Sequence, residues 1–183
     1  MTIIENQHIR VHDLVFRPFL TEKDILNRVQ EIGTQIATQF ADKNPLFVSV
    51  LNGAFIFMAD LMRACPIPCE VNFVRLNSYD GVSSTGAVQT VLGMNQNIEG
   101  RHIIIVEDII DTGNTMKDFI ETINIQRPAS VTLVTLLLKP DAVQHPISID
   151  YTGFEIPNKF VVGYGLDYNE QGRNIRDIYQ LLE

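Results

Sequence analysis

The residues best suited to chemistry lie together in the stretch 107–115. Glu107 and Asp108 are adjacent carboxylates, and they supply hard oxygen atoms that could bind Mg²⁺ directly or accept hydrogen bonds from sugar hydroxyls. Asp111 follows three residues later and could act as a base. The stretch then continues as Thr112, Gly113, Asn114 and Thr115. Carboxylates are therefore followed directly by small residues that let a backbone approach a ligand closely.

The elements on either side would position these groups. Residues 103–106 are all β-branched and apolar, as expected of a strand buried on both faces of a parallel sheet. After the small residues, apolar side chains recur at helical spacing, at Met116, Phe119, Ile120 and Ile123. A tight turn thus opens a helix. Its free N–H groups and positive dipole end suit a phosphate monoester, and the acids fall at the carboxyl end of the strand, where ligands bind in open α/β sheets.

A simpler interpretation of this stretch is purely structural. Asp111 or Thr112 would then be a helix N-cap, and the acid pair would be a solvated strand end. The stretch is neither a Walker A loop nor a G-x-G-x-x-G dinucleotide loop, because neither pattern occurs in the sequence.

The rest of the chain predicts an α/β fold. Residues 46–51 read as a second buried strand, which ends at Asn52-Gly53 and is followed by a helix. Thr21 and Asp24 resemble a helix start, and an apolar stripe then runs to Phe40. Residues 131–138 form another apolar strand. Strand-loop-helix units in succession indicate a mostly parallel open sheet flanked by helices.

Composition narrows the function classes. The chain has 183 residues, which suits a single domain over 1–183. Its formal net charge of −8 argues against nucleic-acid and anionic-membrane partners, which normally meet a basic surface. No apolar run of about 18 residues and no signal peptide are present, so we expect a cytoplasmic protein.

The segment V-E-D-I-I-D-T-G-N-T resembles the phosphoribosyl-diphosphate-binding signature of type I phosphoribosyltransferases, specifically the hypoxanthine-guanine (6-oxopurine) branch. The tail G-F-E-I-P-N-K-F-V-V-G-Y-G-L-D-Y-N-E-Q-G-R is similar to the same family. The resemblance spans about 47–173 and implies the type I fold with a small hood. The hood is expected from about 1–20 and 150–183.

The resemblance also implies roles for the central motif and its neighbours. Asp111 would be the catalytic base near purine N7, and the phosphoribosyl group would be bound by Glu107, Asp108, Asp111, Thr112, Gly113, Asn114 and Thr115. Pyrophosphate would be bound by Leu51, Asn52, Gly53 and Arg173. The family commonly has a basic residue at position 52, so Asn52 removes a cation. We predict a cis Leu51–Asn52 peptide bond, as the family sometimes has.

The purine site and a lid are implied in the same way. Lys139 would contact the C6 oxygen of the purine, and the aromatic ring of Phe160 would stack on the base. The main chain of Val161 would bind the edge of the base. Asp167 is grouped with these residues and resembles the ligand of a second Mg²⁺, so the predicted metal ligands are Glu107, Asp108 and Asp167. Ser78 and Tyr79 match the family's flexible loop, which would exclude water.

The implied reaction is the Mg²⁺-dependent transfer of ribose 5-phosphate from 5-phosphoribosyl 1-diphosphate to N9 of hypoxanthine and guanine. The products would be IMP or GMP and pyrophosphate, and the enzyme would be a homodimer or homotetramer. Three alternatives stay open: a nucleotide-sensing regulator, a nucleotide-binding subunit without activity, and a transferase specific for xanthine or a pyrimidine.

Overall fold

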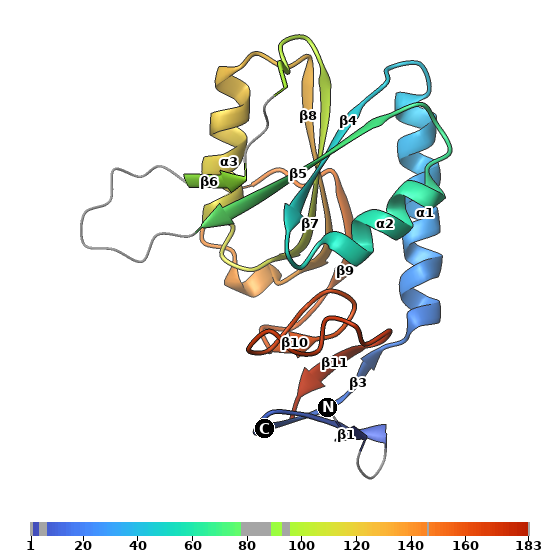
Figure 1. Cartoon of the computed structure of the whole chain (residues 1–183), viewed down its shortest axis with the longest axis vertical. Helices are drawn as coiled ribbons and strands as arrows, with labels where there is room; N and C mark the ends of the chain where they lie inside the picture. Colours follow the sequence, from blue (N-terminus) through green and yellow to red (C-terminus); the bar gives the residue numbers. More distant parts are fainter. Residues whose placement is uncertain (1, 4–6, 78–88, 93–95, 146, 183) are drawn as a thin grey trace, which may run out of the picture.

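Two sheets organise the chain (Figure 1). The computed structural model describes residues 2–3, 7–77, 89–92, 96–145 and 147–182. Within this part of the chain, the larger sheet has the strand order β6-β5-β4-β7-β8-β9, and the smaller has the order β1-β2-β3-β11-β10.

The larger sheet is mostly parallel, as predicted. Its parallel strands are β4 (Leu46–Leu51), β5 (Glu70–Asn77), β7 (His102–Ile110), β8 (Ser130–Leu138) and β9 (Tyr151–Glu155). Edge strand β6 (Gln89–Leu92) runs antiparallel to β5. From β4 the chain passes to β5 on one side and then to β7 on the other. The space between the carboxyl ends of β4 and β7 is therefore the topological switch point, where ligands bind in such sheets.

Strand β7 is longer than its apolar run suggested. It continues past the acid pair to Ile110 and stays paired with β8 as far as Leu138. Its pairing with β4 ends earlier, at the pair Ser49–Val106. The last part of β7, which carries Glu107 and Asp108, consequently has a paired strand on only one side.

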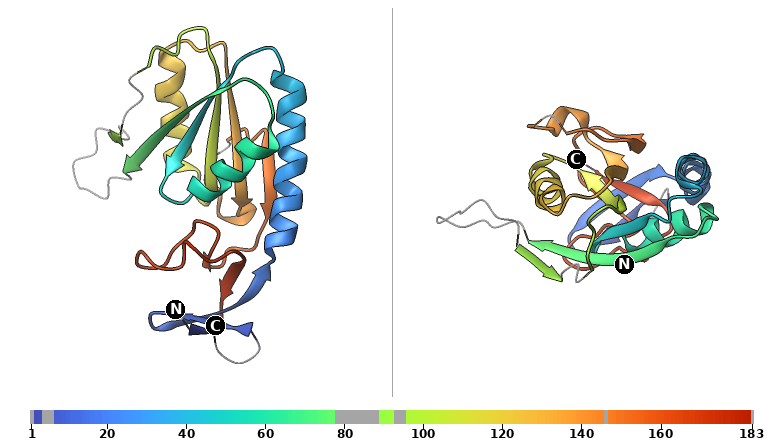
Figure 2. Two further views of the ribbon diagram at one scale, coloured as in Figure 1. Left: turned by 45° about the vertical axis from the view of Figure 1, so that its right-hand side comes forward. Right: turned by 90° about the horizontal axis from the view of Figure 1, so that it is seen from above.

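Helices cover both faces of the larger sheet (Figure 2). The helices α1 (Glu22–Phe40) and α2 (Phe55–Ala64) share one hydrophobic cluster with Phe47, and α3 (Asn114–Ile125) shares another with Leu46 and Val48. This division follows from the alternation of side chains along β4. Helix α1 begins as predicted, because the Thr21 hydroxyl accepts a hydrogen bond from the Asp24 amide at 3.2 Å.

The smaller sheet is the predicted hood. Its strands are β1 (Thr2–Ile3), β2 (Ile9–Val11), β3 (Leu14–Leu20), β10 (Val161–Val162) and β11 (Ile178–Leu181), all antiparallel to their neighbours. The range 150–183 expected for the hood was too long, because β9 belongs to the larger sheet. Val161 and Ile178 of the hood pack in the same hydrophobic cluster as α1 and α2.

Candidate active site

A cleft of about 360 Å³ opens at the switch point between β4 and β7. Its walls come from four places in the sequence, one of which is Leu76 of β5. The end of β4 and the loop after it contribute 50–53, the β7–α3 connection contributes 107–113 with Thr115 and Met116, and the tail contributes Asp167 and Arg173. The cleft thus brings together most residues predicted to bind the phosphoribosyl group and pyrophosphate.

The turn before α3 has the geometry expected of a phosphate loop. Gly113 is the N-cap of α3, with a left-handed φ of 82°, and it has no side chain to cap the helix. The amide of Lys117 donates to the Gly113 carbonyl at 3.0 Å and closes the first turn. The amides at the start of α3, ahead of Lys117 in the sequence, have no acceptor within the helix, and such N-terminal amides attract anions. Gly113 is therefore the N-cap, and not Asp111 or Thr112, although the Thr112 hydroxyl accepts a hydrogen bond from the Asn114 amide at 3.5 Å.

The acid pair is held in a way that suits a cation. Burial raises the pKa of Glu107 well above its usual range, and the neighbouring charge of Asp108 raises it further. Burial also raises the pKa of Asp108, although hydrogen bonds from Glu107 and from the Ile109 amide, at 2.9 Å, oppose the effect. Glu107 Oε2 is buried and has no hydrogen-bond partner in the described part of the chain. A carboxylate pair with an unsatisfied inner oxygen fits a hard divalent cation.

The loop after β4 lies directly against this pair. Its Leu51–Asn52 peptide bond is cis, which confirms that prediction. A Cβ at Gly53 would lie 1.5 Å from Asp108 Oδ2, so a side chain at position 53 would displace the carboxylate. The loop contributes Asn52 rather than a cation, and the cleft's guanidinium comes instead from Arg173.

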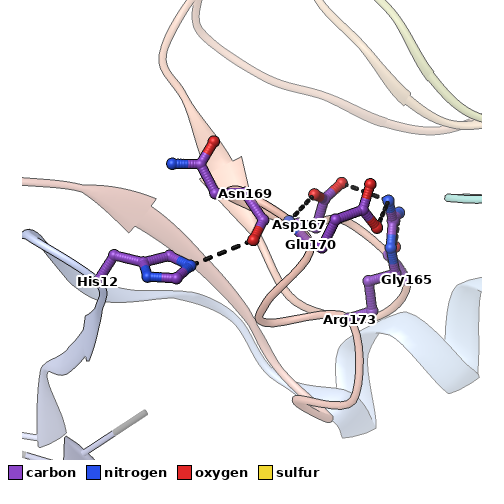
Figure 3. A network of polar contacts seen from close by, with 6 residues as sticks. All are labelled: His12, Gly165, Asp167, Asn169, Glu170 and Arg173. Carbon is purple, nitrogen blue, oxygen red and sulfur yellow. Dashed lines mark hydrogen bonds and ion pairs between the residues drawn. The ribbon is translucent and has the colours of Figure 1, made fainter.

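The tail residues form a network of their own (Figure 3). Arg173 pairs with Asp167 at 2.7 Å and with Glu170 at 3.5 Å, and it also donates to the Gly165 carbonyl at 2.9 Å. The second oxygen of Asp167 accepts from the Glu170 amide at 2.8 Å. Both carboxylate oxygens of Asp167 are therefore already engaged.

The residues predicted to bind purine are divided between two places. Lys139 is only 7% exposed, and its Nζ donates to Asp111 Oδ2 at 2.7 Å, which joins it to the cleft. Phe160 lies on the hood side with 42% of its surface exposed, and its ring is 6.2 Å from that of Phe16. Val161 is buried in β10. The lid residues Ser78 and Tyr79 lie outside the described residues.

Two residues that the sequence interpretation did not single out support the tail. Tyr164, buried between two glycines, donates to Asp60 on α2 at 2.7 Å. Asp60 is the only acid in the segment F-I-F-M-A-D-L-M-R-A, which is a signal that could have pointed to it.

A family model described as the phosphoribosyl transferase domain matches residues 19–169. The chain belongs to the phosphoribosyl transferase family.

Relatives of this phosphoribosyl transferase support a more specific placement. The chain is 39% identical over 165 residues to the hypoxanthine-guanine phosphoribosyltransferase of Bacillus subtilis, covering 90% of this chain and 91% of that protein. A crystal structure of a hypoxanthine phosphoribosyltransferase from Staphylococcus aureus superposes with a TM-score of 0.86 at 38% identity, covering 91% of each chain. The chain also matches the bifunctional protein TilS/HprT of Listeria monocytogenes at 39% identity, where it spans only 26% of that protein.

The predicted family and the predicted phosphoribosyltransferase fold are confirmed by these matches. The prediction of an enzyme of the phosphoribosyltransferase class is confirmed at the same level. Among the described residues, no helix is both long and apolar enough to span a membrane.

Proposed function

We propose that this phosphoribosyl transferase moves ribose 5-phosphate from 5-phosphoribosyl 1-diphosphate to N9 of hypoxanthine or guanine, giving IMP or GMP and pyrophosphate. The observation that carries the proposal is the ion pair of buried Lys139 with Asp111, because Asp111 lines the cleft together with the turn before α3 and the acid pair. The names of the Bacillus subtilis and Staphylococcus aureus relatives support the choice of base.

The phosphoribosyl diphosphate would bind along the floor of the cleft. The amides of 112–115 at the start of α3 would hold the 5-phosphate, because helix N-terminal amides carry no intrahelical acceptor. The loop Leu51–Asn52–Gly53 and Arg173 would hold the pyrophosphate group. Asn52 offers an amide in place of a cation, so Arg173 supplies the positive charge on this side.

Glu107 and Asp108 would hold a Mg²⁺ ion. When bound, Mg²⁺ neutralises the diphosphate and stabilises it as a leaving group. Within the described ranges, no group of three or more His, Cys, Asp or Glu side chains is placed to hold a metal ion, and Mg²⁺ commonly uses one or two carboxylates together with substrate oxygens and water. For Asp167 to hold a second Mg²⁺, Arg173 must leave it, and the incoming pyrophosphate would provide an alternative partner for that guanidinium.

The base step depends on the Lys139–Asp111 pair. Nζ of Lys139 carries three N–H donors and gives one to Asp111, so it can also donate to the C6 oxygen of a 6-oxopurine. Adenine would place an amino donor against this ammonium, which disfavours it. As the bond between C1 of the sugar and pyrophosphate breaks and the bond from C1 to N9 forms, Asp111 takes the proton lost by the purine ring. Phe160 would stack on the base, and the main chain of Val161 would read its edge.

We also propose that the protein is a homodimer or homotetramer in the cytoplasm, with Ser78 and Tyr79 on a lid. An apolar surface supports self-association. Phe55, Val71 and Phe73 are 43%, 39% and 41% exposed, and β5 carries two of them. Large exposed apolar side chains often mark an interface between proteins.

The test is product formation from phosphoribosyl diphosphate and Mg²⁺ with hypoxanthine, guanine, xanthine, adenine and uracil separately. We expect turnover with hypoxanthine and guanine that EDTA abolishes. Turnover with adenine or uracil alone would contradict the role of Lys139, and xanthine activity would widen the specificity. Binding of phosphoribosyl diphosphate without any turnover would instead indicate a regulator.

A further inference from the structure

Tyr164 occupies a backbone conformation that the surrounding structure must enforce. It lies with Gly165 at the tip of a two-residue turn, in which the Gly163 amide donates to the Leu166 carbonyl at 3.0 Å and the Leu166 amide donates back at 3.1 Å. Its φ is 50°, in the left-handed region that side chains disfavour. Such residues persist where several contacts hold them, and they gather at functional sites.

Three contacts hold Tyr164. Its amide donates to the Ile175 carbonyl at 2.7 Å, its side chain is buried with 3% of its surface exposed, and its hydroxyl donates to Asp60 Oδ2 at 2.7 Å. Burial raises the pKa of Tyr164, and the Asp60 carboxylate raises it further. The phenol therefore stays protonated and remains a donor. Asp60 is kept in place on α2 by an ion pair with Arg63.

The turn touches both elements proposed to bind pyrophosphate. The Gly165 amide donates to the Arg173 carbonyl, and Arg173 Nη1 donates to the Gly165 carbonyl, each at 2.9 Å. A Cβ at Gly165 would lie 2.0 Å from the Gly53 carbonyl oxygen, so the turn packs directly on the loop after β4. That loop leads into α2, the helix that carries Asp60.

We propose that the hydrogen bond from Tyr164 to Asp60 is a positioning contact that sets Arg173 against the Asn52–Gly53 loop and thereby determines the affinity for pyrophosphate. Tyr164 does not touch the substrate in this arrangement. It acts through Gly165 and Arg173, while Asp60 ties the turn to the helix that follows the loop. The proposal rests on the proposed function, since it assigns a role within the same cleft.

The test compares Tyr164→Phe with a matched control, Tyr151→Phe. The Tyr151 hydroxyl also joins two elements, by a hydrogen bond from β9 to Gln39 on α1, but neither of these elements lines the cleft. Calorimetric titration with magnesium pyrophosphate gives the affinity without turnover. We expect the dissociation constant to rise about tenfold in Tyr164→Phe and to stay unchanged in Tyr151→Phe, because hydrogen bonds to charged groups are the stronger ones. The KM for hypoxanthine should not change. A loss of folded protein would instead lower the number of binding sites at unchanged affinity.

Two changes at Asp60 make the test independent of the tyrosine. Asp60→Asn keeps an oxygen that accepts from Tyr164 and should bind magnesium pyrophosphate nearly as the unaltered protein does. Asp60→Ala removes the acceptor from a helix surface that tolerates alanine, and it should reproduce the loss even if Tyr164→Phe folds poorly. Equal affinities in Tyr164→Phe, Asp60→Ala and the unaltered protein would overturn the positioning role and leave the proposed function standing. No binding of magnesium pyrophosphate by the unaltered protein would overturn the proposed function itself.

Discussion

Residues 107–115 and residues 160–173 serve the same proposed site, but different contacts hold them there. The first segment lies on consecutive elements, β7 and α3, and its backbone is fixed by pairing with β8 and by the helix start. The second contains the two-residue strand β10 and two short turns, each closed by an isolated β-bridge, Gly163–Leu166 and Tyr168–Gln171. Two of its side chains are anchored to distant parts of the chain, Tyr164 to Asp60 and Tyr168 to Asp13 at 3.0 Å. Its backbone is anchored as well, because the Asn169 carbonyl bonds to the His12 ring at 3.2 Å (Figure 3).

This difference has a physical consequence. A segment held by its own strand and helix keeps its shape when one side chain changes, because the backbone hydrogen bonds remain. A segment built of short turns depends more on its side-chain contacts with distant parts of the chain, and its geometry changes when one of them is removed. Substitutions in the first segment should therefore alter chemistry, whereas substitutions around the second should alter the placement of ligands.

The largest expected effect is on the rate of the reaction, and it tests the role of the first segment in the chemistry. Asp111→Asn removes the proposed base but keeps an oxygen that can accept from Lys139. We expect kcat to fall by about 10²–10⁴-fold, the usual contribution of a general base, with little change in the affinity for phosphoribosyl diphosphate. Steady-state kinetics and calorimetric titration measure the two quantities. Glu121→Gln on α3, outside the cleft, is the charge-matched control, and near-normal turnover in Asp111→Asn would refute the assignment.

A pair of glycine substitutions compares the two segments directly. Gly113 and Gly165 both have positive φ, of 82° and 103°. A Cβ at Gly113 would meet no atom closer than 3.8 Å, whereas one at Gly165 would lie 2.0 Å from a backbone oxygen. Gly113→Ala should cost only about 1–2 kcal/mol of folding free energy, the penalty for the left-handed backbone. Gly165→Ala should cost more, roughly 3 kcal/mol, because the turn must also move away from Gly53.

Urea unfolding of the two variants and the unaltered protein gives the free energies of unfolding. Equal losses would mean that the turn around Gly165 shifts as easily as the start of α3, and the proposed difference between the segments would be wrong. Magnesium pyrophosphate affinity adds a second measure for Gly165→Ala, since Arg173 bonds to this glycine.

The sequence predicts the features that are formed by neighbouring residues, but not those that depend on contacts between distant parts of the chain. The motif around Asp108 and Gly113 was predictable because a strand, a turn and a helix follow one another, and each has a local signature. The length of β7 was not, because only its pairing with β8 shows that it continues to Ile110. The Lys139–Asp111 pair spans 28 residues and the Tyr164–Asp60 bond spans 104. Contacts over such separations are set by the packing of the whole fold, which no local pattern records.

The smallest expected effect concerns the surface offered to the purine. Phe160 is supported by Tyr168, whose ring meets it edge-on with centroids 5.9 Å apart, and Tyr168 is held in turn by Asp13. Phe160→Leu keeps an apolar side chain but loses ring stacking, so the KM for hypoxanthine should rise about fivefold, equivalent to ~1 kcal/mol. Tyr168→Phe keeps the supporting ring and loses only its bond to Asp13, so the rise should be smaller, about twofold. Steady-state kinetics at saturating phosphoribosyl diphosphate measure both. If Tyr168→Phe had no effect while Phe160→Leu did, the ring contact alone would hold Phe160, and the long-range anchor at Asp13 would be dispensable for this part of the tail.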